Sequence, residues 1–66
     1  MEAKFYKRYS IWGHAIRQGI RYAASGTITQ RNKLVEASGV LGCLEGEEQA
    51  TSAGLAWCRA WVDNHG

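Results

Sequence analysis

Two Cys and two His are the soft ligands that a transition metal would need. They are Cys43, Cys58, His14 and His65, and no two of them are neighbours along the chain. Zinc sites usually draw on closely spaced ligand pairs, so this spacing predicts no metal site. A Cys43–Cys58 disulfide is a second interpretation, because it would join the end of a strand to a helix. Free Cys is among the most buried residue types, and we expect two buried thiols.

No group of residues indicates catalysis. A nucleophile needs a nearby base and an orienting acid, and nothing in the sequence ties His14 to Ser10, to Cys43 or to a carboxylate. Glu47 and Glu48 are explained by the first turn of a helix, where the macrodipole favours negative charge. No Gly-rich stretch ends in Lys-Ser or Lys-Thr, as a phosphate-binding loop requires. We predict that the protein is not an enzyme and has no catalytic or cofactor-binding residues.

Charge is distributed unevenly along the 66 residues. Residues 1–35 hold seven Lys or Arg against Glu2 alone, a net charge of +6. Residues 36–66 hold five acids against Arg59, a net charge of −4, which leaves +2 for the whole chain. This pattern predicts an electrically polarised molecule with a basic sheet and an acidic helix.

A basic sheet face is one candidate binding surface, suited to a nucleic acid. Its Arg and Lys could follow a phosphate backbone while Trp12 or His14 stacks on a base. The other interpretation is a solvated face, which antiparallel sheets commonly keep. The pI of about 8.7 is lower than the values above about 9 that are typical of nucleic-acid-binding domains. The polar residues of this face are Arg17, Arg21, Ser25, Thr27, Thr29 and Lys33.

The outer edge of the last helix is a candidate surface for a protein partner. Leu55 and Val62 lie seven residues apart. They belong either to the flank of the core or, if exposed, to an apolar strip that a partner could cover. Tyr9 and Trp12 are suited to anchoring a protein interface. The candidate partner-binding residues are therefore Tyr9, Trp12, Arg17, Arg21, Lys33, Glu48, Leu55, Arg59 and Val62.

Three strands and one helix must position these residues. Residues 5–16 mix aromatic and branched side chains without helical spacing, residues 20–29 alternate in polarity, and residues 34–37 form a third strand that resumes at 40–41. Turns are expected at Gln18-Gly19 and around Asn32. From residue 47 to 64 the apolar side chains recur at three- and four-residue spacing, which predicts an amphipathic helix. Its expected inner face is Ala50, Ala53, Gly54, Trp57, Cys58 and Trp61.

An apolar helix stripe and an apolar sheet face bury each other most simply by packing together. We therefore predict an α+β fold: a three-stranded antiparallel β-sheet followed by one C-terminal α-helix packed on one face. The chain should form a single domain over residues 1–66, with the sheet at about 5–41 and the helix at about 47–64.

The stretch Gly42-Cys43-Leu44-Glu45-Gly46-Glu47 and the following residues to Ala53 resemble a known pattern. They are similar to the last strand and helix start of AP2-type and integrase-type three-stranded DNA-binding domains, and Arg21-Tyr22-Ala23-Ala24 is similar to the second strand of that family. Those domains carry several Arg in the first strand, whereas residues 9–16 offer Trp12 and His14 but no Arg. The resemblance therefore implies the fold and not the function.

We interpret the sequence as a non-enzymatic protein-interaction module that docks on a larger protein. Its size and charge separation resemble small phage accessory and inhibitor proteins. Nucleic-acid binding by the basic sheet face is the alternative. Since a small domain buries only about 60% of its unfolded surface, a homodimer is a further hypothesis. No apolar run approaches the roughly 20 residues of a membrane span and no leader pattern is present, so we expect a cytoplasmic protein.

Overall fold

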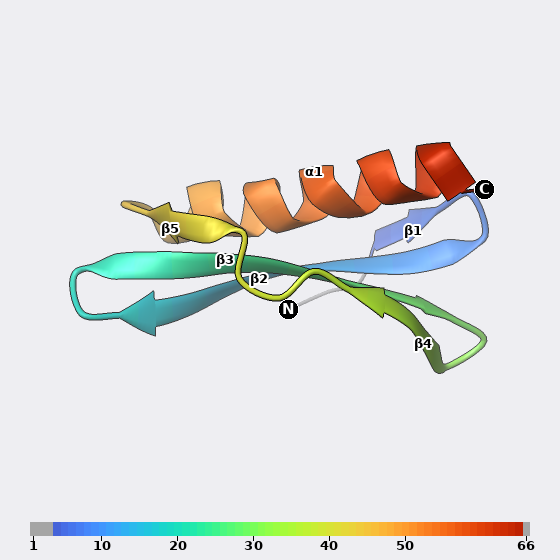
Figure 1. Ribbon diagram of the computed structural model, residues 1–66, viewed down its shortest axis with the longest axis horizontal. Coiled ribbons are helices and arrows are strands. Elements are labelled where there is room, and N and C mark those ends of the chain that lie inside the picture. Colours follow the sequence, from blue (N-terminus) through green and yellow to red (C-terminus); the bar gives the residue numbers. More distant parts are fainter. Residues whose placement is uncertain (1–3, 66) are drawn as a thin grey trace.

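A single helix lies across one face of an antiparallel sheet in the computed structural model, which describes residues 4–65 (Figure 1). Strands β1 to β4 are neighbours in chain order, and β5 pairs with β3 on the same side as β4. This arrangement confirms the predicted α+β class with the helix packed on one face, although the sheet has more strands than the three expected. The elements are β1 (Lys4–Tyr6), β2 (Tyr9–Gln18), β3 (Arg21–Gln30), β4 (Lys33–Ala37), β5 (Gly42–Leu44) and α1 (Glu47–His65).

One additional strand arises where the first expected strand is divided. The other, β5, begins at Gly42 and not at Val40-Leu41, where the third strand was expected to resume. The first expected strand turns back at Lys7-Arg8, whose φ angles of 46° and 76° place both residues in the left-handed region of a two-residue hairpin turn. The third is interrupted at Ser38, whose N–H donates to the Gly26 carbonyl at 2.9 Å and whose hydroxyl accepts from the Gly26 N–H at 2.8 Å. The chain rejoins β3 through a 2.7 Å bond from the Leu41 N–H to the Ala24 carbonyl.

Register decides which residues face the helix. The pairs Ile11–Ile28, Gly13–Gly26 and Ala15–Ala24 lie side by side in β2 and β3. Since alternate residues of a strand share a face, all three pairs point toward α1. The intervening pairs, Ser10–Thr29, Trp12–Thr27 and His14–Ser25, lie on the face that the helix does not cover.

Helix and sheet make their closest contact through three glycines, Gly13, Gly26 and Gly54. A Cβ atom on Gly26 would lie 2.7 Å from the Gly54 carbonyl oxygen and 2.8 Å from the Cys58 sulfur. A Cβ on Gly54 would collide with the Ser25 carbonyl, and one on Gly13 would collide with the Thr51 carbonyl. Only residues without a side chain allow the two backbones to approach this closely.

This contact shifts the buried stripe of the helix from the predicted one. The buried residues are Ala50, Gly54, Cys58 and Val62, spaced four apart. Cys58 and Val62 pack with Ile11 and Ile28. The predicted inner residues Ala53, Trp57 and Trp61 are only partly buried. Where backbones touch at Gly54, no room is left beneath the helix for an indole ring, so Trp57 and Trp61 pack along its sides.

We predict that Gly54→Ala destabilises the fold, although Ala is the better helix former by about 1 kcal/mol. The added methyl must push α1 away from the Ser25 carbonyl, which should lower the free energy of unfolding by about 2 kcal/mol or more. Urea unfolding followed by Trp fluorescence measures the change. The control Ala56→Gly, at an exposed position of the same helix, should lose about 1 kcal/mol from helix propensity alone. A more stable Gly54→Ala protein would contradict the tight contact.

Candidate functional site

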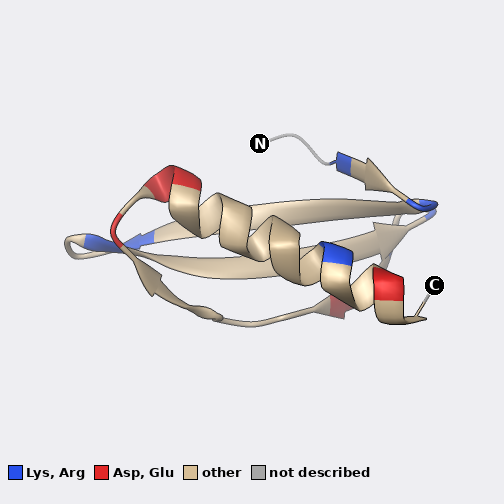
Figure 2. Ribbon diagram, turned by 90° about the horizontal axis from the view of Figure 1, so that it is seen from above, with Lys and Arg blue, Asp and Glu red and all other residues tan. Residues whose placement is uncertain are grey.

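Two hairpin turns lie at the same end of the sheet, beside the end of the helix (Figure 1). They are Lys7-Arg8 between β1 and β2, and Arg31-Asn32 between β3 and β4. Three of these four residues are basic, and Lys33 follows directly. At the opposite end, Glu47 and Glu48 open the helix where the β2–β3 turn also lies (Figure 2). The positive charge is therefore balanced less well at the end that carries the two turns.

All four turn residues have left-handed backbone conformations. The φ angles are 46° and 76° at Lys7 and Arg8, and 54° and 64° at Arg31 and Asn32. Such turns favour Asn-Gly, since a left-handed conformation costs roughly 1–2 kcal/mol for most other residues. The chain therefore holds three cations at positions where Asn or Gly would give a more stable turn. Local strain of this kind is typical of functional positions.

Lys7 fastens the first hairpin to the helix. Its Nζ lies 2.7 Å from Asp63 Oδ1, and the Tyr6 hydroxyl donates to the same oxygen at 2.9 Å. These bonds hold the pKa of Asp63 below its ordinary value and raise the pKa of Lys7. They also offset the unfavourable position of an acid in the last turns of a helix. Within residues 4–65 neither Arg8 nor Arg31 makes an ion pair, so their guanidinium groups remain available.

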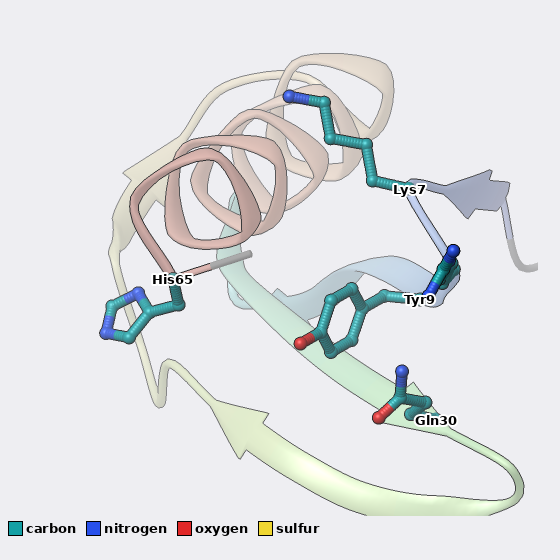
Figure 3. Close-up of a pocket in the computed structure, with 5 residues that line it drawn as sticks. Lys7, Tyr9, Gln30 and His65 are labelled. Atoms are coloured by element: carbon teal, nitrogen blue, oxygen red, sulfur yellow. The ribbon is translucent and has the colours of Figure 1, made fainter.

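Two hollows adjoin Arg8, and the second also adjoins Arg31. The first, of about 700 Å³, is lined by Lys7, Arg8, Tyr9, Gln30 and His65, and Figure 3 shows its residues coming from the hairpin, from β3 and from the helix end. The second, of about 590 Å³, lies over β1 and the β3–β4 turn. We call its lining residues the hairpin end: Phe5, Arg8, Ser10, Gln30, Arg31 and Asn32. With two guanidiniums, two amides, a hydroxyl and an aromatic ring, the hairpin end is suited to an anionic ligand that also has planar, hydrogen-bonding groups.

An aromatic stack supports the helix side of this region. Tyr9 meets Trp61 edge to face, with ring centroids 6.0 Å apart, and Trp61 stacks on His65 at 4.0 Å. His65 Nδ1 lies 2.8 Å from the Trp61 carbonyl, which can only accept, so this nitrogen carries a proton. Tyr9, a predicted anchor for a partner, is half-buried against Trp61 and also lines the first hollow.

The predicted basic sheet face is not continuous in the structure. Arg17 pairs with Tyr22 and points to the helix side, whereas Arg21 pairs with Gln18 and points to the other side. Lys33 lies at the opposite end of the sheet. The prediction placed these residues on one face because it did not fix the register between strands, which decides where each side chain points.

On the uncovered face, polar and aromatic side chains pair across β2 and β3. His14 Nε2 lies 2.9 Å from the Thr27 hydroxyl. Trp12 is largely buried, and its indole N–H has no hydrogen-bond partner among the described residues. Trp12 is therefore a poorly exposed anchor for a partner.

The outer edge of the helix carries charge but no apolar strip. Val62 is completely buried and Leu55 is half-buried against the core, so the core interpretation holds for both. Glu48 and Arg59 are exposed, as expected. Val62 in particular cannot contact a partner while α1 is packed on the sheet, because it faces Ile11 and Ile28.

Four exposed apolar side chains instead lie along the free edge of the sheet. Leu34 is 66% exposed, Val40 63% and Leu41 40%. We call Leu34, Val35, Val40 and Leu41 the β4–β5 edge. Sequence reasoning missed it, because no local pattern says which strand of a sheet will lack a neighbour. The break at Ser38-Gly39, which leaves Val40-Leu41 outside a regular strand, was the one available signal.

Both thiols are free, with Cys58 buried and Cys43 exposed. The prediction of two buried thiols is right for Cys58 and wrong for Cys43, because β5 lies at a sheet edge. The Cys58 sulfur lies 3.4 Å from the Thr27 carbonyl and 3.6 Å from the Trp12 carbonyl, and burial raises its pKa. In the described part of the chain, no three His, Cys, Asp or Glu side chains gather closely enough to hold a metal ion.

The chain matches no protein-family model, and no curated protein or solved structure is significantly similar to it. The resemblance to three-stranded DNA-binding domains therefore stays a hypothesis. Across residues 4–65, no helix combines the length and the apolar character that a membrane crossing requires. Function must accordingly be argued from the hairpin end and the β4–β5 edge.

Thiol labelling should separate the two cysteines. In the native protein near neutral pH, iodoacetamide should modify Cys43 alone, because Cys58 is buried between the helix and the sheet and its raised pKa keeps it protonated. Mass spectrometry should find a second label only after denaturation. The control Cys43→Ser should take up no label while folded. Equal labelling rates at both residues would contradict the packing of α1 on the sheet.

The strain in the turns should be measurable as stability. We predict that the double variant Arg8→Gly with Arg31→Asn, which brings both turns closer to Asn-Gly, raises the free energy of unfolding by about 1 kcal/mol. The control Arg17→Gln with Arg21→Gln removes the same charge without changing a left-handed residue, and should stay within roughly 0.5 kcal/mol of the wild type. Chemical denaturation measures the free energy of unfolding of both variants and of the wild type. If the turn variant is no more stable than the wild type, the turns are not strained.

Proposed function

We propose that this protein is a non-enzymatic interaction module, of the phage accessory or inhibitor type, that docks on a larger protein through its β4–β5 edge. The observation that carries the proposal is the exposure of four apolar side chains at that edge. Isolated exposed apolar residues are ordinary, whereas a group of them beside a free strand edge is typical of a contact surface.

The backbone of the edge supports recognition of an extended segment. All five residues of β4 are exposed, and among the described residues β4 pairs only with β3. The outer N–H and C=O groups of β4 can therefore bond to an incoming strand, as in β-strand addition. The bonds between Ser38 and Gly26 hold the break at Ser38-Gly39 in place, so the edge is formed before a partner arrives.

The scarcity of charged residues along the edge indicates which kind of partner segment it binds. Between Lys33 and Glu45 the only charged residue is Glu36. The partner segment is therefore an extended, largely apolar stretch of another protein. A charged segment would leave its charges without partners along this surface.

The alternative function, nucleic-acid binding, is not supported by the sheet face first considered, because Arg17, Arg21 and Lys33 do not share a face. The hairpin end is the surface that favours it. There Arg8 and Arg31 lie together around one hollow.

A displayed library of random peptides tests the docking proposal. Selection should enrich largely apolar peptides in which every second side chain is similar, as expected for an added strand. Methylating alternate backbone nitrogens of a selected peptide should abolish its binding. The variant Leu34→Lys with Leu41→Lys should bind the same peptides at least about tenfold more weakly, because the charges oppose apolar burial. The control Ile20→Lys changes a side chain that is 92% exposed at the far end of the sheet and should bind normally.

Peptides that bind the edge variant as well as the wild type would overturn the proposal. Sedimentation over a range of concentrations provides the second readout. A dimer that the Leu34→Lys and Leu41→Lys changes dissociate would assign the edge to a second copy of this chain instead of another protein.

A further inference from the structure

We propose that the hairpin end binds single-stranded nucleic acid, with one nucleotide in the hollow between β1 and the β3–β4 turn. The proposal deepens the nucleic-acid alternative and is independent of docking at the β4–β5 edge. It rests on residues that are distant in sequence, in β1, in the two turns and at the ends of β2 and β3, yet line one hollow.

The two arginines supply the contacts to phosphate. Arg8 and Arg31 are exposed, line the same hollow and form no ion pair with any other described residue. A guanidinium offers paired N–H donors that match a phosphate, so two of them can hold consecutive backbone groups. Among the described residues, no carboxylate lines the hollow to compete for them.

Phe5 supplies a surface for a base. It is 80% exposed and pairs with Ser10 on the sheet face that the helix leaves open. Because the ring is already exposed, a base can stack on it without any other contact of the protein being broken. Stacking is how proteins hold unpaired bases without strict sequence preference. Gln30 and Asn32 place amide groups in the same hollow, where they can donate to and accept from a base edge.

The combination favours a single strand. The bases of a duplex are stacked on one another and offer no face to Phe5, and a phosphorylated peptide would use the arginines without requiring the ring. The hollow, of about 590 Å³, is in the range of sites that hold small molecules and can accept one nucleotide. Arg8 and Arg31 occupy left-handed turn positions where Asn or Gly would be more stable. Their presence there despite the strain agrees with a role in binding.

Fluorescence anisotropy with a labelled oligodeoxythymidylate of about 12 nucleotides tests the proposal. The wild-type protein should bind at low salt, and its affinity should fall as salt rises, because neutralised phosphates release counterions. A duplex of equal length should bind more weakly. No complex at about 50 mM salt would overturn the site and the nucleic-acid function together.

Two variants separate the roles of charge and stacking. Arg8→Gly with Arg31→Asn should weaken binding and reduce the slope of log affinity against log salt by about 1.4, since each lost phosphate contact removes about 0.7. Phe5→Ala should weaken binding by about tenfold and leave the slope unchanged, and Phe5→Tyr should restore the affinity. The arginine variant is expected to be more stable than the wild type, so its lost binding cannot be attributed to unfolding.

The matched control is Arg17→Gln with Arg21→Gln, which removes the same charge at the other end of the sheet. If this control loses as much affinity as the hairpin-end variant, the protein binds nucleic acid but not at this site. The Leu34→Lys and Leu41→Lys protein should retain its affinity for the oligonucleotide. These variants therefore distinguish a wrong assignment of the hairpin end from a wrong assignment of the β4–β5 edge.

Discussion

The fold depends on the contact between backbones at Gly13, Gly26 and Gly54. Three residues without side chains let the helix rest directly on the sheet, which fixes its height and direction. Cys58 sits beside this contact, with its sulfur near two strand carbonyls, and Ile11, Ile28 and Val62 fill the space toward the hairpins. A domain this small has a modest core, so close approach substitutes for a larger number of buried side chains.

The position of the helix determines which surfaces remain free. The helix α1 covers one face of the sheet and buries Ala50, Gly54, Cys58 and Val62 there. What remains is the uncovered sheet face, the β4–β5 edge and the turns at the hairpin end (Figure 1). The hairpin end lies away from the glycine contact, whereas the β4–β5 edge is joined to Gly26 by the two hydrogen bonds of Ser38. Substitutions of the exposed side chains at the hairpin end can therefore change binding without disturbing the core.

The helix and the central strand were predictable from local pattern. Residues 47–65 carry apolar side chains at helical spacing and acids in the first turn, and residues 21–30 alternate in polarity. The separate strand β1 was not predictable, because Lys7-Arg8 lacks the Asn or Gly that marks a tight turn. The exact buried stripe depended on Gly54 meeting two other glycines, which no local pattern reveals. The hairpin end was missed for a related reason, since its residues meet only through register and two turns.

The central claim is that the hairpin end and the core of this domain are separate. Backbone amide chemical shifts, recorded by NMR during titration with oligodeoxythymidylate, test it most directly. We predict that shifts change in residues 4–10 and 30–33, while the amides of Gly13, Gly26 and Gly54 stay in place. Changes spread along α1, or confined to the β2–β3 turn near Arg17 and Arg21, would contradict the account.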